Sequence, residues 1–399
     1  MTSKMQHFSM AELAAIRADL AAAPEHVHLD NAGASLMPAQ VRAVMHEHLT
    51  REGAVGGYVA QEQAAEGIER AYGAVAGLIG AAPDEIAFAG SATDAWDRLF
   101  YSLPLEPGAH IVTAYSEYCG NYIAMHDRAR KCSADIIVIG RDHHGGLDLV
   151  ALDRALGDPR AKLLALSHVA SSSGDILDAA GAGRIARAHG VPFLLDACQS
   201  IGQLPVDVGE IGCDMLTGTA RKFLRGPRGV GFLYVARTML PRLEPVMLTN
   251  MSAEWRSRDG FAMREDARLF EAWERNIAGI LGLGAAVDYA RKLGMPRISS
   301  RALALAAQLR EALGGLSDVE CLDPGSRLSA IVTFRHRRVD PVRMKTLAAA
   351  RNIAIQVASV LHTRLDLEAR GIESAVRVSP HYFTLEDEIG RFVDFVAAL

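Results

Sequence analysis

A lysine that follows an apolar, strand-like segment is the residue with the clearest chemical potential in this sequence. Lys222 comes shortly after the segment MLTGT and precedes the loop GPRG. Neighbouring cations and limited hydration depress the pKa of a lysine, as a Schiff-base-forming amine requires, and three arginines lie close by in the chain: Arg221, Arg225 and Arg228. Thr219 could donate its hydroxyl to a phosphate. A basic surface loop is the commoner meaning of such a cluster, so this segment alone leaves both interpretations open.

A carboxylate and an amide follow a second strand-like segment. In the run FLLDACQ, Asp196 ends the apolar stretch and Gln199 comes three residues later. Burying Asp196 beside an apolar strand is costly unless a cation or a strong donor pairs with it. The ring nitrogen of pyridoxal 5′-phosphate (PLP) is such a partner, because the carboxylate keeps it protonated and the cofactor electron-withdrawing. Gln199 could then reach the ring's phenolic oxygen. Capping of the following helix by Asp196 is the alternative.

A third strand-like segment ends in small residues and leads into a helix. Gly90, Ser91 and Ala92 let the backbone approach an anion closely, and the helix N-terminus and the Thr93 hydroxyl can donate to it. The segment therefore predicts a phosphate-binding turn, although many ordinary helix caps have the same composition.

The elements that must position these residues follow an alternating pattern. Short apolar runs alternate with segments whose apolar residues recur at i, i+3 and i+4, which is typical of an α/β fold with a mostly parallel sheet covered on both faces. Ligands bind at the carboxyl ends of the strands in such a sheet, so we expect the three segments to converge. The expected strands are Ile86–Phe88, His110–Thr113, Asp135–Ile139, Leu163–His168, Phe193–Asp196, Met215–Gly218 and Gly231–Val235.

The pattern changes after about residue 240. We divide the chain into an N-terminal helical arm (1–25), a large PLP-binding domain (26–250) and a small C-terminal α+β domain with a linking helix (251–399). The elements expected in the last part are a helical run Ala267–Leu293, strand-like pieces Ala330–Phe334, Ile353–Val357 and Ala375–Ser379, and a final helix capped by Thr384.

Composition excludes several classes of function. A formal net charge of −5 without a concentrated basic patch argues against nucleic-acid binding. No apolar run approaches the roughly 18–20 residues needed to cross a bilayer, so we expect no membrane association. The five cysteines are scattered singly, which suits a reducing cytoplasm. His46 and His48 face apart on a helix, and His143 and His144 lie in a Gly-rich turn, so we expect no metal site.

One motif points elsewhere. The segment GAGRIA (181–186) matches the dinucleotide fingerprint GxGxxA, but that fingerprint has meaning only directly after a strand. The preceding strand is expected to end near His168, so we set the match aside. An NAD-dependent dehydrogenase or a non-catalytic α/β binding protein is kept as a distant alternative.

The order and spacing of the three chemical segments resemble fold-type I PLP enzymes of the class V aminotransferase and cysteine desulfurase family. The resemblance runs from HLDNAGAS (28–35) to VRVSPHYFT (376–384). It implies a large domain with a mainly parallel seven-stranded sheet, a smaller C-terminal α+β domain, PLP as cofactor, and a homodimer whose active sites border the subunit interface.

The resemblance also implies a role for each matching residue. Lys222 forms the Schiff base with PLP and shuttles protons, Asp196 pairs with the pyridinium nitrogen, and Gln199 contacts the ring oxygen. The further cofactor contacts that it implies are the backbone of Ala92, the hydroxyls of Thr93 and Thr219, and the stacking ring of Tyr118.

On the substrate side, the resemblance implies an amino acid whose α-carboxylate is clamped by Arg377, with a geometry that lysine could not imitate. Ser171 stands where the family commonly has asparagine. Cysteine desulfurases carry a nucleophilic cysteine before this arginine, whereas residues 356–377 here contain none. A persulfide-forming desulfurase is therefore disfavoured. Candidates for contacting the substrate side chain are Asn250, Trp255, Arg256 and the loop His362–Arg364.

The reaction itself is the least determined feature. The segment RLFEAWE (268–274) resembles a branch that holds isopenicillin-N-epimerase-like proteins and sulfoxide lyases. We favour a C–S lyase that acts by β-elimination on a cysteine-derived substrate, after Lys222 removes the Cα proton. An aminotransferase and an amino-acid epimerase are the alternatives.

Overall fold

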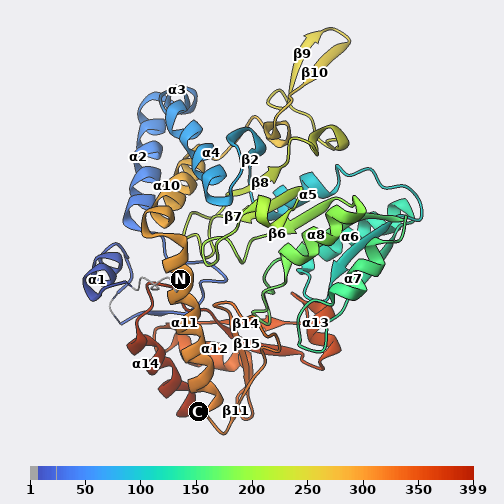
Figure 1. Cartoon of the computed structure of the whole chain (residues 1–399). Helices are drawn as coiled ribbons and strands as arrows, with labels where there is room; N and C mark the ends of the chain where they lie inside the picture. The colour runs from blue at the N-terminus through green and yellow to red at the C-terminus, as the bar shows by residue number, and fades with distance from the viewer. Residues whose placement is uncertain (1–7, 24) are drawn as a thin grey trace, which may run out of the picture.

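The computed structural model describes residues 8–23 and 25–399, and its largest element is a seven-stranded sheet (Figure 1). The strand order is β2-β8-β7-β6-β5-β3-β4. Neighbours from β7 to β4 are parallel, whereas β8 is antiparallel to both β2 and β7. The strands are β2 Ile86–Ala89, β3 His110–Ala114, β4 Asp135–Ile139, β5 Ala161–Ser167, β6 Phe193–Asp196, β7 Met215–Thr219 and β8 Gly231–Val235. The predicted α/β class and mainly parallel seven-stranded sheet are confirmed.

Both faces of this sheet are buried, as the continuous apolar strands require. Successive residues of β5 and β6 enter two different cores, with Leu164 and Leu195 in one and Leu163 and Leu194 in the other. The first core also contains α4 Ala65–Ile79, α7 Leu149–Leu156, α8 Ala179–His189, α9 Val208–Ile211 and α10 Ile277–Leu293. The second contains α5 Ala92–Phe100 and α6 Cys119–Cys132. Helices α2 Ala39–Val55 and α3 Gly57–Gln63 precede α4.

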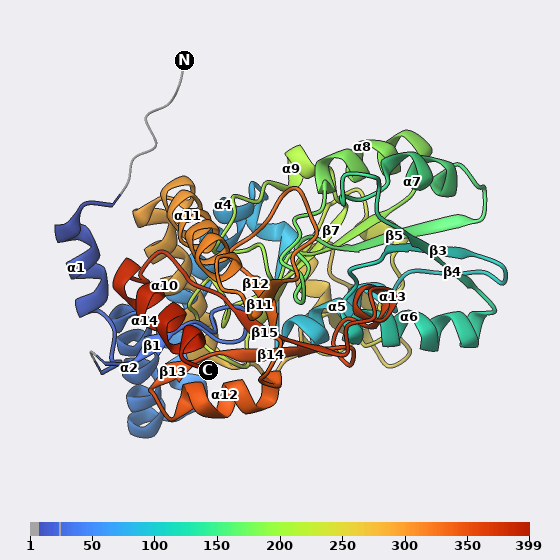
Figure 2. The same cartoon turned by 90° about the horizontal axis from the view of Figure 1, so that it is seen from below.

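The second, smaller sheet is antiparallel, with the order β11-β12-β15-β14. Its strands are β11 Val319–Cys321, β12 Val332–His336, β14 Gln356–Ser359 and β15 Ser374–Val378. The helices of this region are α11 Met295–Gly314, α12 Pro341–Ala349, α13 Arg364–Ala369 and α14 Glu386–Ala397. The N-terminal strand β1 Val27–His28 pairs in parallel with β13 Ile353–Ala354, so an early segment of the chain joins the C-terminal region (Figure 2).

Two local expectations are wrong. The helical run expected from residue 267 is a short 3-10 turn, η3 Ala267–Phe270, then extended chain, and α10 begins only at residue 277. The reason is tertiary, because the Glu271 carboxylate accepts a hydrogen bond from Phe88 N–H at 2.8 Å, which holds this segment along β2. The N-cap of α14 is Leu385 rather than Thr384, whose hydroxyl instead accepts a hydrogen bond from His381 N–H.

The remaining elements lie at the periphery. The hairpin of β9 Ala253–Ser257 and β10 Gly260–Met263 projects from the body of the molecule (Figure 1). Helix α1 Met10–Ala18 lies in the predicted N-terminal arm, of which residues 1–7 and 24 are outside the described residues, and two 3-10 turns are η1 Pro83–Glu85 and η2 Leu240–Arg242. Within the described residues, no helix is both long and apolar enough to span a membrane. The division of the chain at residues 25 and 250 stays a prediction.

Candidate active site

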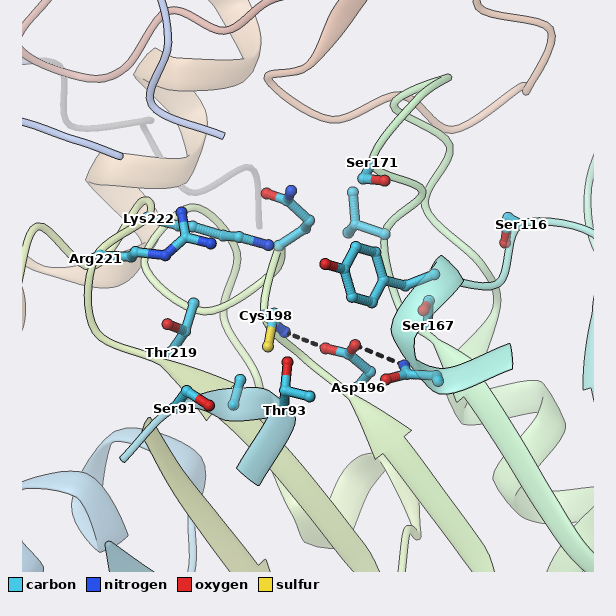
Figure 3. Close-up of a pocket in the computed structure, with 15 residues that line it drawn as sticks. Ser91, Thr93, Ser116, Ser167, Ser171, Asp196, Cys198, Thr219, Arg221 and Lys222 are labelled. Carbon is cyan, nitrogen blue, oxygen red and sulfur yellow. Dashed lines mark hydrogen bonds between the residues drawn. The ribbon is translucent and has the colours of Figure 1, made fainter. Parts of the chain in front are cut away.

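A cavity lies where the carboxyl ends of β5, β6 and β7 meet the N-termini of α5 and α6 (Figure 3). The three predicted segments converge here, as the position of ligands in parallel sheets leads one to expect. The lining residues are Ser91, Ala92, Thr93, Ser116, Tyr118, Asn121, Ser167, Val169, Ser171, Asp196, Cys198, Gln199, Thr219, Arg221 and Lys222. Apart from Arg377 and the candidates for contacting the substrate side chain, every predicted site residue therefore lies in the wall of this cavity.

Lys222 lies just beyond the end of β7, and its side chain extends along the upper side of the cavity in Figure 3. Among residues 8–23 and 25–399, no side chain or backbone group forms a hydrogen bond or ion pair with its amine. Burial lowers the pKa of Lys222, and the cations of Arg221 and Arg377 lower it further, while Asp196 opposes them. A lysine with a lowered pKa and a free amine is suited to nucleophilic chemistry at this position.

Asp196 ends β6 and is buried, with 9% of its surface exposed. Asn121 Nδ2 donates to its Oδ2 and Cys198 N–H donates to its Oδ1, at 2.9 and 2.8 Å. No lysine, arginine or histidine of the described residues forms an ion pair with it. A buried carboxylate without a cation is costly, so this site fits a ligand that brings a protonated nitrogen.

Gln199 provides a second group without a partner. Its Nε2 donates to Ala32 O at 3.1 Å, whereas its Oε1 is buried and has no hydrogen-bond partner among the described residues. Asp196, Gln199 and Lys222 thus present unsatisfied groups to one cavity. Their chemistry fits PLP, which carries a ring nitrogen, a phenolic oxygen and an aldehyde.

The predicted phosphate-binding turn forms the lower side of the cavity (Figure 3). Ser91 caps α5 by accepting from Asp94 N–H at 3.0 Å, which leaves the first backbone N–H groups of the helix, at Ala92 and Thr93, directed away from the helix body. Anions are stabilised at this end of a helix. Thr219 faces the turn from the end of β7, so the donors named in the sequence analysis are brought together.

Arg221 is a cavity residue to which the sequence assigned no binding role. It lines the cavity and donates to Gly33 O, whereas the other two arginines of the cluster do not line it. Arg225 is turned into the protein, where it donates to Leu36 O and Tyr382 Oη, and Arg228 is exposed. The sequence pattern does not distinguish the three arginines. The path of the loop decides that Arg221 lines the cavity and the other two do not.

Arg377 lies on β15, one contact away from the cavity wall. Its Nη1 donates to Ser171 O and its Nη2 pairs with Asp30 Oδ1, both at 3.3 Å. Besides this bond to Arg377, Ser171 forms a hydrogen bond with Thr363, whose Oγ1 lies 3.3 Å from Ser171 Oγ. The small sheet therefore carries its arginine to the edge of the large sheet's cavity. The role of Arg377 in binding a carboxylate stays a prediction.

Tyr118 precedes α6 and lines the same cavity, and burial raises the pKa of its phenol. The loop His362–Arg364 is close to it, because Cys119 N–H donates to His362 O at 3.1 Å. The other candidates for contacting the substrate side chain, Asn250, Trp255 and Arg256, do not line this cavity. Trp255, in the projecting hairpin, is 80% exposed and does not line the cavity of its own chain.

Among the described residues, no group of three or more histidine, cysteine and carboxylate side chains could hold a metal ion.

Residues 27–392 match the family described as aminotransferase class-V. The chain belongs to the class V aminotransferase family. This class V protein is 30% identical to a probable cysteine desulfurase of Methanothermobacter thermautotrophicus, over 94% of each chain, and 28% identical to one of Pyrococcus abyssi, over 96% of each.

Solved structures agree with the assignment. The apo structure of cysteine desulfurase from Thermococcus onnurineus superposes with a TM-score of 0.89 at 26% identity, covering 96% of this chain and 97% of that one. The cystine C–S lyase C-DES, in complex with its product cysteine persulfide, gives a TM-score of 0.85 at 20% identity, covering 94% of this chain and 98% of that one. The second likeness concerns the fold alone. The predicted family is confirmed.

Proposed function

We propose that this class V enzyme uses PLP to cleave a C–S bond of a cysteine-derived amino acid by β-elimination. The observation that carries the PLP assignment is the meeting of a free lysine amine, a buried carboxylate without a cation and an anion-binding helix end in one cavity. The relatives named cysteine desulfurase and the neighbour named a cystine C–S lyase support a sulfur-containing substrate.

The cavity residues divide the cofactor between them. Lys222 would hold it covalently through its aldehyde carbon, Asp196 would accept a hydrogen bond from the protonated ring nitrogen, and Gln199 would contact the ring oxygen. The groups proposed for the phosphate are Ala92 N–H, Thr93, Thr219 and, as an addition to the sequence-based set, Arg221. Tyr118 supplies a face for the ring. Bound PLP supplies the electron sink for the charge left at Cα when a proton is removed.

The protein's own groups perform the proton transfers. Arg377 binds the substrate α-carboxylate beside Ser171 and thereby fixes which bond of Cα faces Lys222. Once the substrate's amino group has displaced Lys222 from the aldehyde carbon, the freed amine would take the Cα proton, because burial and nearby cations lower its pKa. The electrons of the Cα–H bond would form a Cα=Cβ double bond while the Cβ–S bond breaks and sulfur leaves with its bonding electrons. Water would then convert the released enamine into pyruvate and ammonia.

The absence of cysteine from residues 356–377 supports elimination over sulfur transfer to the protein. The loop at Ser359–Thr363 contacts Ser171 and Cys119 N–H, and it contains no cysteine. Elimination needs no acceptor on the protein, since the sulfur leaves with the product.

The test uses purified holoenzyme with cystine, a cysteine S-conjugate and a cysteine sulfoxide. Elimination predicts release of pyruvate, ammonia and the sulfur fragment in equal amounts, with Lys222→Ala as the inactive control. Amino-group transfer to a 2-oxo acid without pyruvate would establish an aminotransferase instead. Loss of optical activity at Cα without either product would establish an epimerase.

We also propose a homodimer in a reducing cytoplasm. Large apolar side chains are exposed on α2 and α3 and on the β9–β10 hairpin, among them Tyr58, Trp255 and Phe261. Exposed apolar patches of this kind mark protein interfaces. Sedimentation analysis should give a dimer, and the double variant Trp255→Ser/Phe261→Ser should weaken it. The control Val150→Ser, at an exposed site on α7, should leave the dimer unchanged.

The five free cysteines support a reducing cytoplasm as the compartment, which cell fractionation would check.

A further inference from the structure

A second buried carboxylate lies behind Asp196 and takes no part in the proposed mechanism. Glu117, between β3 and α6, has 2% of its surface exposed. Glutamate is almost never fully buried without a partner of opposite charge, yet no cation of the described residues pairs with Glu117. The carboxyl group of Glu117 therefore depends on its neighbours' hydrogen bonds to carry a charge.

Four hydrogen-bond donors from three elements surround this carboxylate. Its Oε1 accepts from Ser167 Oγ at 2.6 Å, from Tyr118 N–H at 2.9 Å and from Asn121 Nδ2 at 2.9 Å. Its Oε2 accepts from Thr113 Oγ1 at 3.1 Å. Because all four groups donate, the arrangement is built for an acceptor and stabilises the ionised carboxylate.

Asn121 joins the two carboxylates. Its Nδ2 carries two hydrogens and lies 2.9 Å from Glu117 Oε1 and 2.9 Å from Asp196 Oδ2. The amide is therefore held in one orientation, since only the nitrogen end can satisfy both acids. Asp196 accepts from this amide through Oδ2 and from Cys198 N–H through Oδ1, so both oxygens of the carboxylate are held.

We propose that Glu117 is a positioning residue for the cofactor nitrogen: through Asn121 it holds Asp196 in one orientation, and its charge raises the proton affinity of a ring nitrogen bound there. The proposal rests on PLP binding as described above. A second negative charge behind the first favours a nearby cation over its neutral form. The network thus keeps the ring protonated to a higher pH than Asp196 would alone.

The electrostatics of the network agree with this role. Burial raises the pKa of Glu117 to about 7, and the charge of Asp196 raises it too, whereas the bonds from Ser167, Asn121 and Tyr118 N–H lower it. The groups facing Glu117 are Thr113 from β3, Ser167 from β5, Asp196 from β6, and Tyr118 and Asn121 at the start of α6; of these only Asp196 and Tyr118 titrate. Glu117 therefore gains its charge as the pH rises through neutrality.

The variant Glu117→Gln removes the charge and keeps an oxygen that can accept from Asn121, Ser167 and Tyr118 N–H. In holoenzyme carrying PLP labelled with ¹⁵N in the ring, the pH midpoint for ring deprotonation should fall by about one unit, the low end of what a neighbouring charge does. Glu66→Gln is the matched control, because it removes an exposed glutamate on α4 and should leave the midpoint unchanged.

The wild-type enzyme offers a second measurement that does not depend on the variant folding. Its ¹⁵N shift should show an additional inflection below pH 7, because the protonated ring nitrogen lowers the pKa of Glu117 from the value of about 7 that burial gives it. An unchanged midpoint in a folded Glu117→Gln, or a wild-type titration without that inflection, would overturn the proposal. If the wild-type protein binds no PLP at all, the proposed function itself fails, so the two failures are distinguishable.

Discussion

Gly231, at the start of β8, is the position where one added methyl group would test the phosphate-binding turn. The backbone of β8 passes so close to the N-terminus of α5 that a Cβ on residue 231 would lie 2.4 Å from Ser91 C and 2.5 Å from Ala92 N. Ordinary contact begins at 3.4 Å, so Gly231→Ala requires a separation of 3.4 − 2.4 = 1.0 Å. Both neighbours are backbone atoms, and the helix end itself must therefore move.

This displacement has two consequences. Overpacking a dense region costs about 1–3 kcal/mol of stability, so we expect the free energy of unfolding of the apoprotein to fall by that amount. The same shift moves Ala92 N–H and Thr93 away from the phosphate. Loss of one hydrogen bond to a charged group costs about 1.5–3 kcal/mol, which corresponds to a rise in the Kd for PLP of roughly tenfold or more.

Urea unfolding of the apoprotein and titration of its absorbance with PLP measure the two effects. Gly53→Ala is the matched control, because a Cβ at this exposed position in α2 would meet nothing within 4 Å. The control should bind PLP normally and gain up to about 1 kcal/mol from helix propensity. A Gly231→Ala variant that loses stability but binds PLP with unchanged affinity would refute the assignment of this turn to the phosphate.

Three further substitutions address the site and its support. Lys222→Ala removes the amine, so PLP should bind only reversibly and leave no pyridoxyl group on the protein after borohydride reduction, as mass spectrometry would detect. Arg377→Lys should raise KM about tenfold with a smaller change in kcat, because one charge-assisted hydrogen bond to the carboxylate is lost. Glu271→Ala leaves Arg275 a poorly solvated cation and Phe88 N–H without an acceptor, so the free energy of unfolding should fall by about 3–5 kcal/mol in urea.

Each of these three substitutions also has a possible result that would contradict the role given to the residue. A covalent pyridoxyl group on Lys222→Ala would place the attachment elsewhere. Equal KM values for Arg377→Lys and wild type, with kcat reduced, would move Arg377 from substrate binding to chemistry. For Glu271→Ala, the control is Glu66→Ala, whose exposed pair with Arg70 should contribute almost nothing, and equal stability of the two variants would contradict the importance of the buried network.

The sequence by itself determined the class of fold and the heart of the site. The seven strands could be placed because continuous apolar runs of strand length are local features, and the polar groups at their ends follow from the chain order. Lys222, Asp196 and Thr93 therefore had to meet once the sheet was parallel. The helix expected over residues 271–276 failed because helical periodicity was outweighed by the bond from Phe88 N–H to Glu271, 183 residues apart.

Only the tertiary structure decided which polar groups support the site. Asn121 and Asp196 are 75 residues apart, and Asp30 and Arg377 are 347 apart, so no spacing rule could pair them. The choice of Arg221 over Arg225 depends on the path of one loop, in which Arg225 turns away to Leu36 O and Tyr382. Local patterns select the elements because their causes are local, whereas the partners of a buried charge depend on which elements pack around it.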